Sequence, residues 1–242
     1  MPCINYAHRG ASEEYPENTL YSFYMGLEAG ADGIETDIQR TKDGVLVLFH
    51  DDTLERLLNI KKSISEMTYQ ELLQLDFGAC KAERFSGEKI VTLEEFLLHF
   101  GAKSLTFALE IKQLCVEKDT LDMIDRFGLK DKVILTSFLW DSLVAIRKLD
   151  PDIRVGYLTE KVTPEMLDKM KALHMNQICP CIGNFSDEMM ALCKKEGFSI
   201  RFWGVNTEEK MRRAVLSNTD GMTVNHPAAL TRLLREMKNK AD

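Results

Sequence analysis

The 242-residue sequence has no excess of positive charge: 31 Lys and Arg residues face 38 Asp and Glu residues, which gives a formal net charge of −7. Binding to a nucleic-acid backbone requires a basic surface, and the spacing of Lys and Arg supplies none. The sequence therefore predicts no nucleic-acid partner. An anionic ligand must instead be held by local positive charge or by a metal ion.

Long apolar runs are also missing. None approaches the roughly 18 residues of a membrane span, and the N-terminal residues MPCINYAHRG contain no basic stretch followed by an apolar one. We therefore expect a cytoplasmic protein without stable membrane association. Hydrophobic residues make up 45% of the chain, which is enough for a full core.

The six cysteines lack the paired spacing of a zinc site. Cys179 and Cys181 form the one close pair, and no second pair of Cys or His residues follows them at a suitable distance. The cysteines otherwise lie scattered in apolar segments. This pattern predicts reduced core residues.

The sequence does contain a regular alternation of short β-rich runs with longer stretches of helical periodicity. Eight runs fit parallel strands, at residues 3–8, 32–39, 105–111, 132–138, 153–158, 176–180, 198–205 and 221–224. Eight βα units predict a closed (β/α)8 TIM barrel, whereas an open doubly wound sheet more often carries G-x-G-x-x-G after its first strand. We expect one catalytic domain over residues 1–242.

A ninth β-like run, residues 45–49, follows the second strand after only four residues, TKDG. Such a short loop predicts an antiparallel hairpin, so the barrel should be distorted at this point. With Lys42 and Asp43 as the turn centre, the numbers of facing residues sum to about 85. Glu35 should then lie across from His50.

Residues 52–91 are too many for an ordinary βα connection, and we expect them to form a small insertion at the C-terminal rim of the barrel. Helix starts are marked by capping patterns. Asn18 should cap the helix after the first strand, Thr92 should open a capping box, and Thr163 should precede a helix with proline at its first position.

Three carboxylates lie near the C-terminal ends of predicted strands, where (β/α)8 barrels carry their active sites. Glu35 and Asp37 share one face of the second strand, and Glu110 ends the third. Carboxylates aimed into one pocket repel one another unless a cation lies among them. Oxygen ligands without Cys or an evident His favour one Mg²⁺ or Ca²⁺ ion over Zn²⁺.

Positive charge and proton-transfer groups accompany these carboxylates. Arg9 and Lys112 lie at the same strand ends. With the three carboxylates and one divalent ion they give a formal charge of +1, which a phosphodiester would neutralise. His8 and His50 remain for proton transfer, since a histidine titrates near neutral pH and diester cleavage needs both a base and an acid.

These motifs resemble those of the glycerophosphodiester phosphodiesterases, in particular the short cytoplasmic bacterial type. The matching stretches, in order, are AHRG, PENT, ETD, TKDG, FHDDTLER, LEIK and the Trp and DG strand near the end, from about Ala7 to Pro227. The resemblance implies hydrolysis of a glycerophosphodiester to sn-glycerol 3-phosphate and an alcohol. It also implies that the substrate's own 2-hydroxyl attacks first and forms a cyclic phosphate.

The same resemblance implies roles for individual residues. His8 and His50 would form the acid/base pair, and Arg9 and Lys112 would contact the phosphate. The metal ligands would be Glu35, Asp37 and Glu110.

Three departures from the family pattern bear on specificity for the alcohol. Leu57, Leu58 and Ile60 make the insertion more apolar than in the family, Gly204 replaces a threonine, and Asn225 stands where the last strand commonly ends in aspartate.

Two aromatic residues have two interpretations. Trp203 and Phe138 follow predicted strands and either bind substrate as pocket wall or belong to the core.

Other functions remain as alternatives. The barrel either cleaves lysolipids in the manner of a phospholipase D, with Leu57 to Ile60 as an apolar docking patch, or binds phosphodiesters without turnover. Lys112 as a Schiff-base nucleophile is a further hypothesis, which leaves the histidines and carboxylates unexplained. The sequence does not decide the head group, the metal, the choice between monomer and homodimer, or which histidine is the acid.

Overall fold

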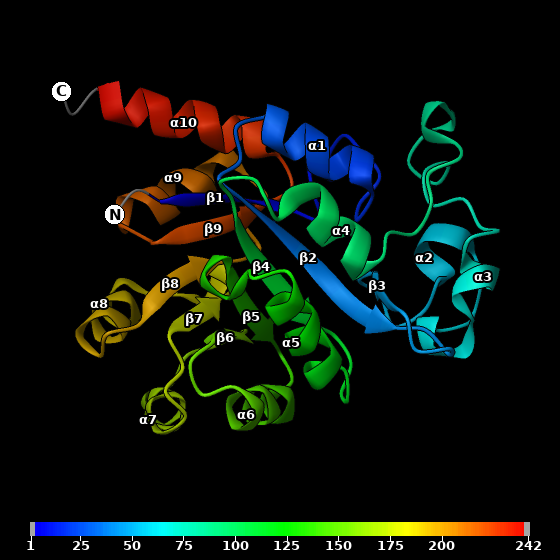
Figure 1. Ribbon diagram of the computed structural model, residues 1–242. Coiled ribbons are helices and arrows are strands. Elements are labelled where there is room, and N and C mark those ends of the chain that lie inside the picture. The colour runs from blue at the N-terminus through cyan, green and yellow to red at the C-terminus, as the bar shows by residue number, and fades with distance from the viewer. Residues whose placement is uncertain (1–2, 240–242) are drawn as a thin grey trace.

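Eight short runs of β-branched and aromatic residues form the parallel strands of a closed barrel in the computed structural model, which describes residues 3–239 (Figure 1). The strands pair in the order β1-β2-β4-β5-β6-β7-β8-β9, and β9 pairs with β1. The barrel strands are β1 (Ile4–His8), β2 (Gly33–Arg40), β4 (Thr106–Ile111), β5 (Val133–Ser137), β6 (Arg154–Thr159), β7 (Gln177–Pro180), β8 (Ser199–Phe202) and β9 (Gly221–Val224). The predicted (β/α)8 barrel is confirmed.

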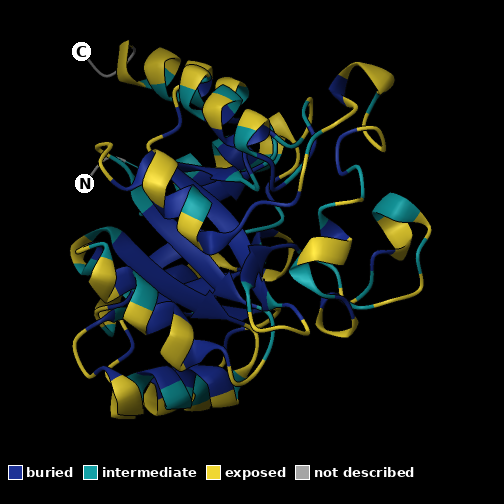
Figure 2. Cartoon of the chain, turned by 45° about the vertical axis from the view of Figure 1, so that its right-hand side comes forward, coloured by how far each residue is buried: buried dark blue, intermediate teal, exposed yellow. Residues whose placement is uncertain are grey.

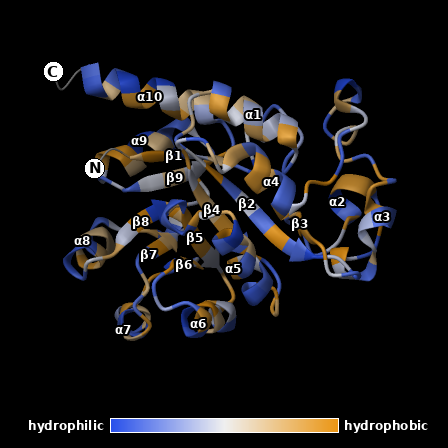
Figure 3. Cartoon of the chain, viewed as in Figure 1, coloured by the Kyte–Doolittle hydropathy of each residue, from blue (hydrophilic) through white to orange (hydrophobic). Residues whose placement is uncertain are grey.

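Helices surround the barrel and bury one face each against it. Figure 2 shows buried strands inside a ring of helices whose outer faces are exposed, and in Figure 3 apolar residues gather on the strands and the inner helix faces. The longer helices are α1 (Leu20–Glu28), α4 (Leu93–Phe100), α5 (Glu117–Arg126), α6 (Trp140–Leu149), α7 (Pro164–Ala172), α8 (Asp187–Lys195), α9 (Glu208–Leu216) and α10 (Pro227–Asn239). Two 3₁₀ turns in this part are η3 (Lys130–Lys132) and η4 (Ile182–Asn184).

The predicted helix caps are confirmed at two positions and wrong at one. Thr92 opens α4 with a capping box, and Thr163 caps α7 ahead of Pro164. Thr19, not Asn18, caps α1. Asn18 has a positive φ of 57° and a buried side chain that bonds to β2, so its amide is not available to the helix.

The predicted hairpin is confirmed, but its register differs by one residue. β3 (Leu46–Leu48) pairs antiparallel with β2, and Ile38 faces Leu48, so the facing numbers sum to 86 and not 85. The turn has three central residues, 42–44, with Gly44 at a φ of 91°. A three-residue loop ending in a left-handed glycine shifts the register in this way. Glu35 and His50 therefore do not face each other in the ladder.

Residues 52–91 lie beside the barrel, beyond the end of β3 (Figure 1). Their short helices and turns are α2 (Glu55–Leu58), η1 (Ile64–Glu66), α3 (Tyr69–Leu72) and η2 (Glu83–Phe85). A hydrophobic cluster of their own, which includes Leu54, Ile64 and Phe77, joins them to Val47 and Phe49.

The apolar stretch Leu57 to Ile60 packs against this cluster and is partly buried. The side chains of Leu57, Leu58 and Ile60 thus add to the small core of residues 52–91. Within residues 3–239, no helix is both long enough and apolar enough to traverse a membrane.

Candidate active site at the strand ends

A cavity of about 400 Å³ opens at the C-terminal ends of the barrel strands. It brings together predicted site residues from four different strand ends: His8, Glu35, Glu110 and Trp203. The full lining is His8, Arg9, Glu35, His50, Glu110, Phe138, Leu158, Arg201, Trp203, Gly204, Val205, Asn206, Thr223 and Asn225. His50 thus lies in the cavity with Glu35, although the hairpin ladder does not pair them.

Three buried carboxylates form an acidic cluster at this cavity: Glu35 and Glu110 line it, and Asp37 lies beside them. One oxygen each of Glu35, Asp37 and Glu110 lies within 4.8 Å of the others. Strand pairing explains the arrangement, because Asp37 on β2 is the register partner of Glu110 on β4. Glu35 Oε2 and Asp37 Oδ1 are buried and have no hydrogen-bond partner. These orphaned oxygens are ready ligand atoms for a cation.

The cluster is electrostatically strained. Burial raises the pKa of Glu35 well above its ordinary value, and the charges of Asp37 and Glu110 raise it further. Burial and Asp37 raise the pKa of Glu110 in the same way. Burial also acts to raise the pKa of Asp37, but the positive charges of Arg9, His50 and Lys112 outweigh it and the pKa is lowered.

Two cations hold Asp37 and Glu110 in place. Arg9 Nε lies 3.3 Å from Asp37 Oδ2, and Lys112 Nζ lies 2.9 Å from Glu110 Oε1 and 3.9 Å from Asp37 Oδ1. Arg9 adopts a positive φ of 55°, and its backbone is held by hydrogen bonds to Glu35 and Asn18. The sequence placed both cations in this site.

Lys112 is not suited to be a Schiff-base nucleophile. An amine nucleophile needs a lowered pKa. Burial acts to lower the pKa of Lys112, but Glu110 and Asp37 outweigh burial and raise it. The ion pairs of Lys112 with Glu110 and Asp37 therefore argue against the aldolase-like alternative.

Both predicted histidines have a defined partner at Nδ1. His8 Nδ1 lies 2.5 Å from Asn225 Oδ1, and its Nε2 lies 3.7 Å from Glu35 Oε2. His50 Nδ1 lies 2.6 Å from Asp51 Oδ1. Burial, followed by the charge of Arg9, lowers the pKa of His8 to about 4. Each ring is thus held at one nitrogen while the other is free for chemistry.

The aromatic pair forms one wall of the cavity. The rings of Trp203 and Phe138 meet edge to face with centroids 5.4 Å apart, and Phe138 is 41% exposed. Trp203 Nε1 donates to the carbonyl oxygen of Cys179 at 3.1 Å, which fixes the indole. Both residues line the cavity, and neither belongs to the hydrophobic core cluster.

Comparison with known proteins gives the family. The sequence model of the glycerophosphoryl diester phosphodiesterase family matches residues 8–229. The chain belongs to this family. Curated relatives named glycerophosphodiester phosphodiesterase include one from Caldanaerobacter subterraneus subsp. tengcongensis, 34% identical over 98% of this chain and 99% of the relative. Another, from Bacillus altitudinis, is 32% identical over 96% and 98%.

A solved structure agrees with this placement. The phosphodiesterase from Oleispira antarctica, in complex with the product sn-glycerol-3-phosphate, superposes with a TM-score of 0.89. It is 25% identical, and the match covers 96% of each chain. The resemblance found in the sequence motifs is confirmed, and the chain is a phosphodiesterase by family.

The acidic cluster fits the divalent cation on which the family generally depends. All three side chains offer oxygen, which hard cations such as Mg²⁺ and Ca²⁺ prefer. The two orphaned oxygens and the raised pKa values indicate that the cluster lacks positive charge.

Sequence reasoning missed two residues that interact with the acidic cluster. Asn18 donates to Asp37 Oδ2 at 3.1 Å and accepts from Thr36, where we expected a helix cap. Arg201 is fully buried beneath the cavity, bonds to Gln177 and Thr223, and lowers the pKa of Glu35 by its charge. A lone Arg within the apolar run FSIRFWGV was the available signal for this second residue.

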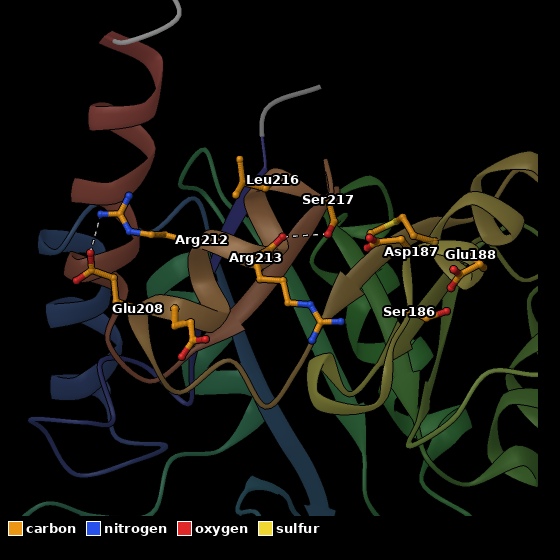
Figure 4. A pocket seen from close by; sticks show the side chains of 10 residues that line it. Ser186, Asp187, Glu188, Glu208, Arg212, Arg213, Leu216 and Ser217 are labelled. Carbon is orange, nitrogen blue, oxygen red and sulfur yellow. Dashed lines mark hydrogen bonds and ion pairs between the residues drawn. The ribbon is translucent and has the colours of Figure 1, made fainter.

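A larger open groove of about 1040 Å³ lies elsewhere, between α8 and α9 (Figure 4). Its two arginines have local partners: Arg212 pairs with Glu208, and Arg213 donates to the carbonyl of Phe185. It contains no histidine, and none of its lining residues is shared with the strand-end cavity. None of the predicted site residues lines this groove.

Proposed function

We propose that this chain hydrolyses glycerophosphodiesters to sn-glycerol 3-phosphate and an alcohol by general acid/base catalysis with His8 and His50. The observation that carries the proposal is one cavity lined by both histidines and by two members of a buried cluster of three carboxylates. We also propose that residues 1–242 act as one catalytic domain, with residues 52–91 at its rim.

Three groups of side chains divide the work of binding. Glu35, Asp37 and Glu110 hold one divalent cation, Mg²⁺ or Ca²⁺. Bound there, the ion supplies polarisation of the phosphoryl oxygens. Arg9 and Lys112 bind the phosphate through their remaining donors. The aromatic wall of Trp203 and Phe138 packs against the organic part of the diester.

The partners of the two histidines suggest their roles. His50 Nδ1 bonds to the carboxylate of Asp51, whereas His8 Nδ1 bonds to the amide oxygen of Asn225. His8 then accepts the proton of the attacking hydroxyl, and His50 donates a proton to the leaving alkoxide as its bond to phosphorus breaks. The substrate's 2-hydroxyl attacks first, and water later opens the cyclic phosphate.

Product release tests the reaction class. Purified protein should release glycerol 3-phosphate from glycerophosphocholine or glycerophosphoethanolamine, lose this activity in EDTA and regain it with Mg²⁺ or Ca²⁺. Cleavage of a lysolipid in place of these diesters would support the lysolipid alternative. Folded protein that turns over no diester with any metal would support the binding alternative.

Single substitutions test the histidine roles. H8A and H50A should each lower kcat by at least about 10² and retain metal binding. A p-nitrophenol leaving group departs without a proton, so H50A should recover most of its rate on a glycerophosphodiester of p-nitrophenol and H8A should not.

The matched control is H99A, because His99 bonds to Tyr24 on the outer surface of α1 and α4. It should keep the activity of the unmodified protein. Recovery of H8A alone would reverse the assignment of acid and base. Normal activity in H8A or H50A would exclude that residue from the reaction.

A further inference from the structure

Arg56 of α2 reaches from residues 52–91 to the barrel and bonds to two carboxylates. Its Nε donates to Asp51 Oδ2 at 2.6 Å. Its two terminal nitrogens donate to Glu17, at 2.9 Å to Oε2 and at 2.7 Å to Oε1. The guanidinium therefore forms a two-point contact with Glu17 and a third bond to Asp51.

Each of these carboxylates also holds a residue of the site. Asp51 accepts from His50 Nδ1 at 2.6 Å, with its other oxygen facing Arg56. Glu17 Oε1 accepts from Arg9 Nη1 at 3.0 Å. The contacts thus run without a break from His50 through Arg56 to Arg9, and from Arg9 to Asp37 at 3.3 Å.

The network is more than a solvated pair on the surface. The side chains of Glu17 and Asp51 are only 17% and 21% exposed, although Arg56 itself is 47% exposed. Burial acts to raise the pKa of Glu17 and of Asp51, but bonds from Arg56 help to lower both. If either carboxylate turned toward water, it would lose a hydrogen bond to Arg56, Arg9 or His50.

We propose that Arg56 is a positioning residue that fixes His50 and Arg9 relative to each other through Asp51 and Glu17. The planar fork of arginine suits this task, because it presents several donors in a fixed geometry, whereas lysine offers one point charge. The inference rests on the proposed function for its effect on turnover, but not for the geometry of His50.

The geometric part is tested by NMR of the histidine rings in R56K, with R84K as the matched control. Arg84 lies in the same segment, stacks on Phe85 and has no contact with the network. The His50 Nδ1 proton, assigned by its absence in H50A, should shift or exchange faster in R56K and stay unchanged in R84K. The His8 signal serves as internal reference, because its partner is Asn225.

The catalytic part is tested by the kinetics of the same two variants. R56K should lower kcat for diester hydrolysis by at least about tenfold, because a small misplacement of a catalytic group is costly, and R84K should not. Lys keeps the charge of the residue, so the loss reports lost geometry. In a double-mutant cycle, adding D51N to R56K should cost less than the sum of the two single losses.

The possible outcomes distinguish the positioning role of Arg56 from the proposed function of the protein. Identical His50 signals and kcat values in R56K and R84K would overturn the positioning role. Loss of the His8 and His50 signals together would show that Arg56 supports the whole rim, which also overturns it. A shifted His50 signal in a protein that turns over no diester would leave the positioning intact and reject the proposed function.

Discussion

Two groups of carboxylates in this protein differ in how far their negative charge is compensated. One is the acidic cluster of Glu35, Asp37 and Glu110. The other belongs to the rim network, which consists of Arg56, Glu17, Asp51, Arg9 and His50. In the cluster, Glu35 is buried beside two more carboxylates and keeps an oxygen without a hydrogen-bond partner. In the rim network, Glu17 is bonded at both oxygens by arginine. The pKa of Glu35 is accordingly raised, and that of Glu17 is lowered.

This difference in compensation distinguishes a ligand site, the acidic cluster, from the rim network, whose carboxylates already have their partners. Uncompensated buried charge costs stability and is retained where a ligand supplies the missing charge. Compensated charge instead fixes geometry. The acidic cluster therefore supplies negative charge for a ligand, and the rim network holds side chains in position.

Among the changes that test this comparison, the largest expected effect comes from Asp37 of the acidic cluster, which contacts Arg9 and Lys112. D37N should weaken Mg²⁺ or Ca²⁺ binding by at least about tenfold, since loss of an outer-shell partner alone costs about 10 to 100-fold. Excess metal should partly restore the rate. Calorimetric titration with metal and kinetics at rising metal concentration measure both effects.

The matched control for this change is D119N, because Asp119 pairs with Arg40 away from the cavity. It should bind metal as the unmodified protein does. Equal affinity in D37N and D119N would contradict the assignment of Asp37 as a ligand.

The pH dependence of stability should distinguish the rim network from the acidic cluster. The folded-state pKa of Glu17 lies below its unfolded value of about 4.3. Its stabilisation is therefore present above that pH and is lost as pH falls through the folded-state pKa. Between about pH 5 and pH 3, the melting temperature of E17Q should fall less steeply than that of the unmodified protein.

Melting curves in EDTA check this prediction without a contribution from metal. E94Q is the control, because Glu94 and its partner Arg126 are both more than half exposed. Parallel curves for E17Q and the unmodified protein would show that the bonds from Arg56 and Arg9 do not stabilise the fold.

The smallest expected effect is a change in melting temperature when one carboxylate of the acidic cluster is neutralised at neutral pH. In EDTA, E35Q should melt higher than the unmodified protein by at least about 2 °C, because burial and the neighbouring carboxylates penalise the charged form of Glu35 in the folded protein, and glutamine carries no charge. Added metal should raise the melting temperature of the unmodified protein more than that of E35Q, since only a folded ligand set binds. A lower melting temperature for E35Q in EDTA would mean that Glu35 is already compensated.

The sequence located the acidic cluster because strand periodicity places Glu35 and Asp37 on one face, and barrel topology brings Glu110 beside them. It missed the role of Asn18, because an Asn before a helix is equally suited to capping and to a buried bond. It also misplaced the hairpin register, since TKDG allows turns of two or three central residues.

Periodicity, turn signals and strand-end chemistry by themselves determined the barrel, the hairpin and the candidate histidines, cations and metal ligands, because these depend on local spacing along the chain. Only the tertiary structure decided that Asn225 partners His8, that Arg201 lies under the carboxylates and that Arg56 joins Glu17 to Asp51. These contacts depend on which side chains from distant segments meet in space, and on how burial then changes their charge.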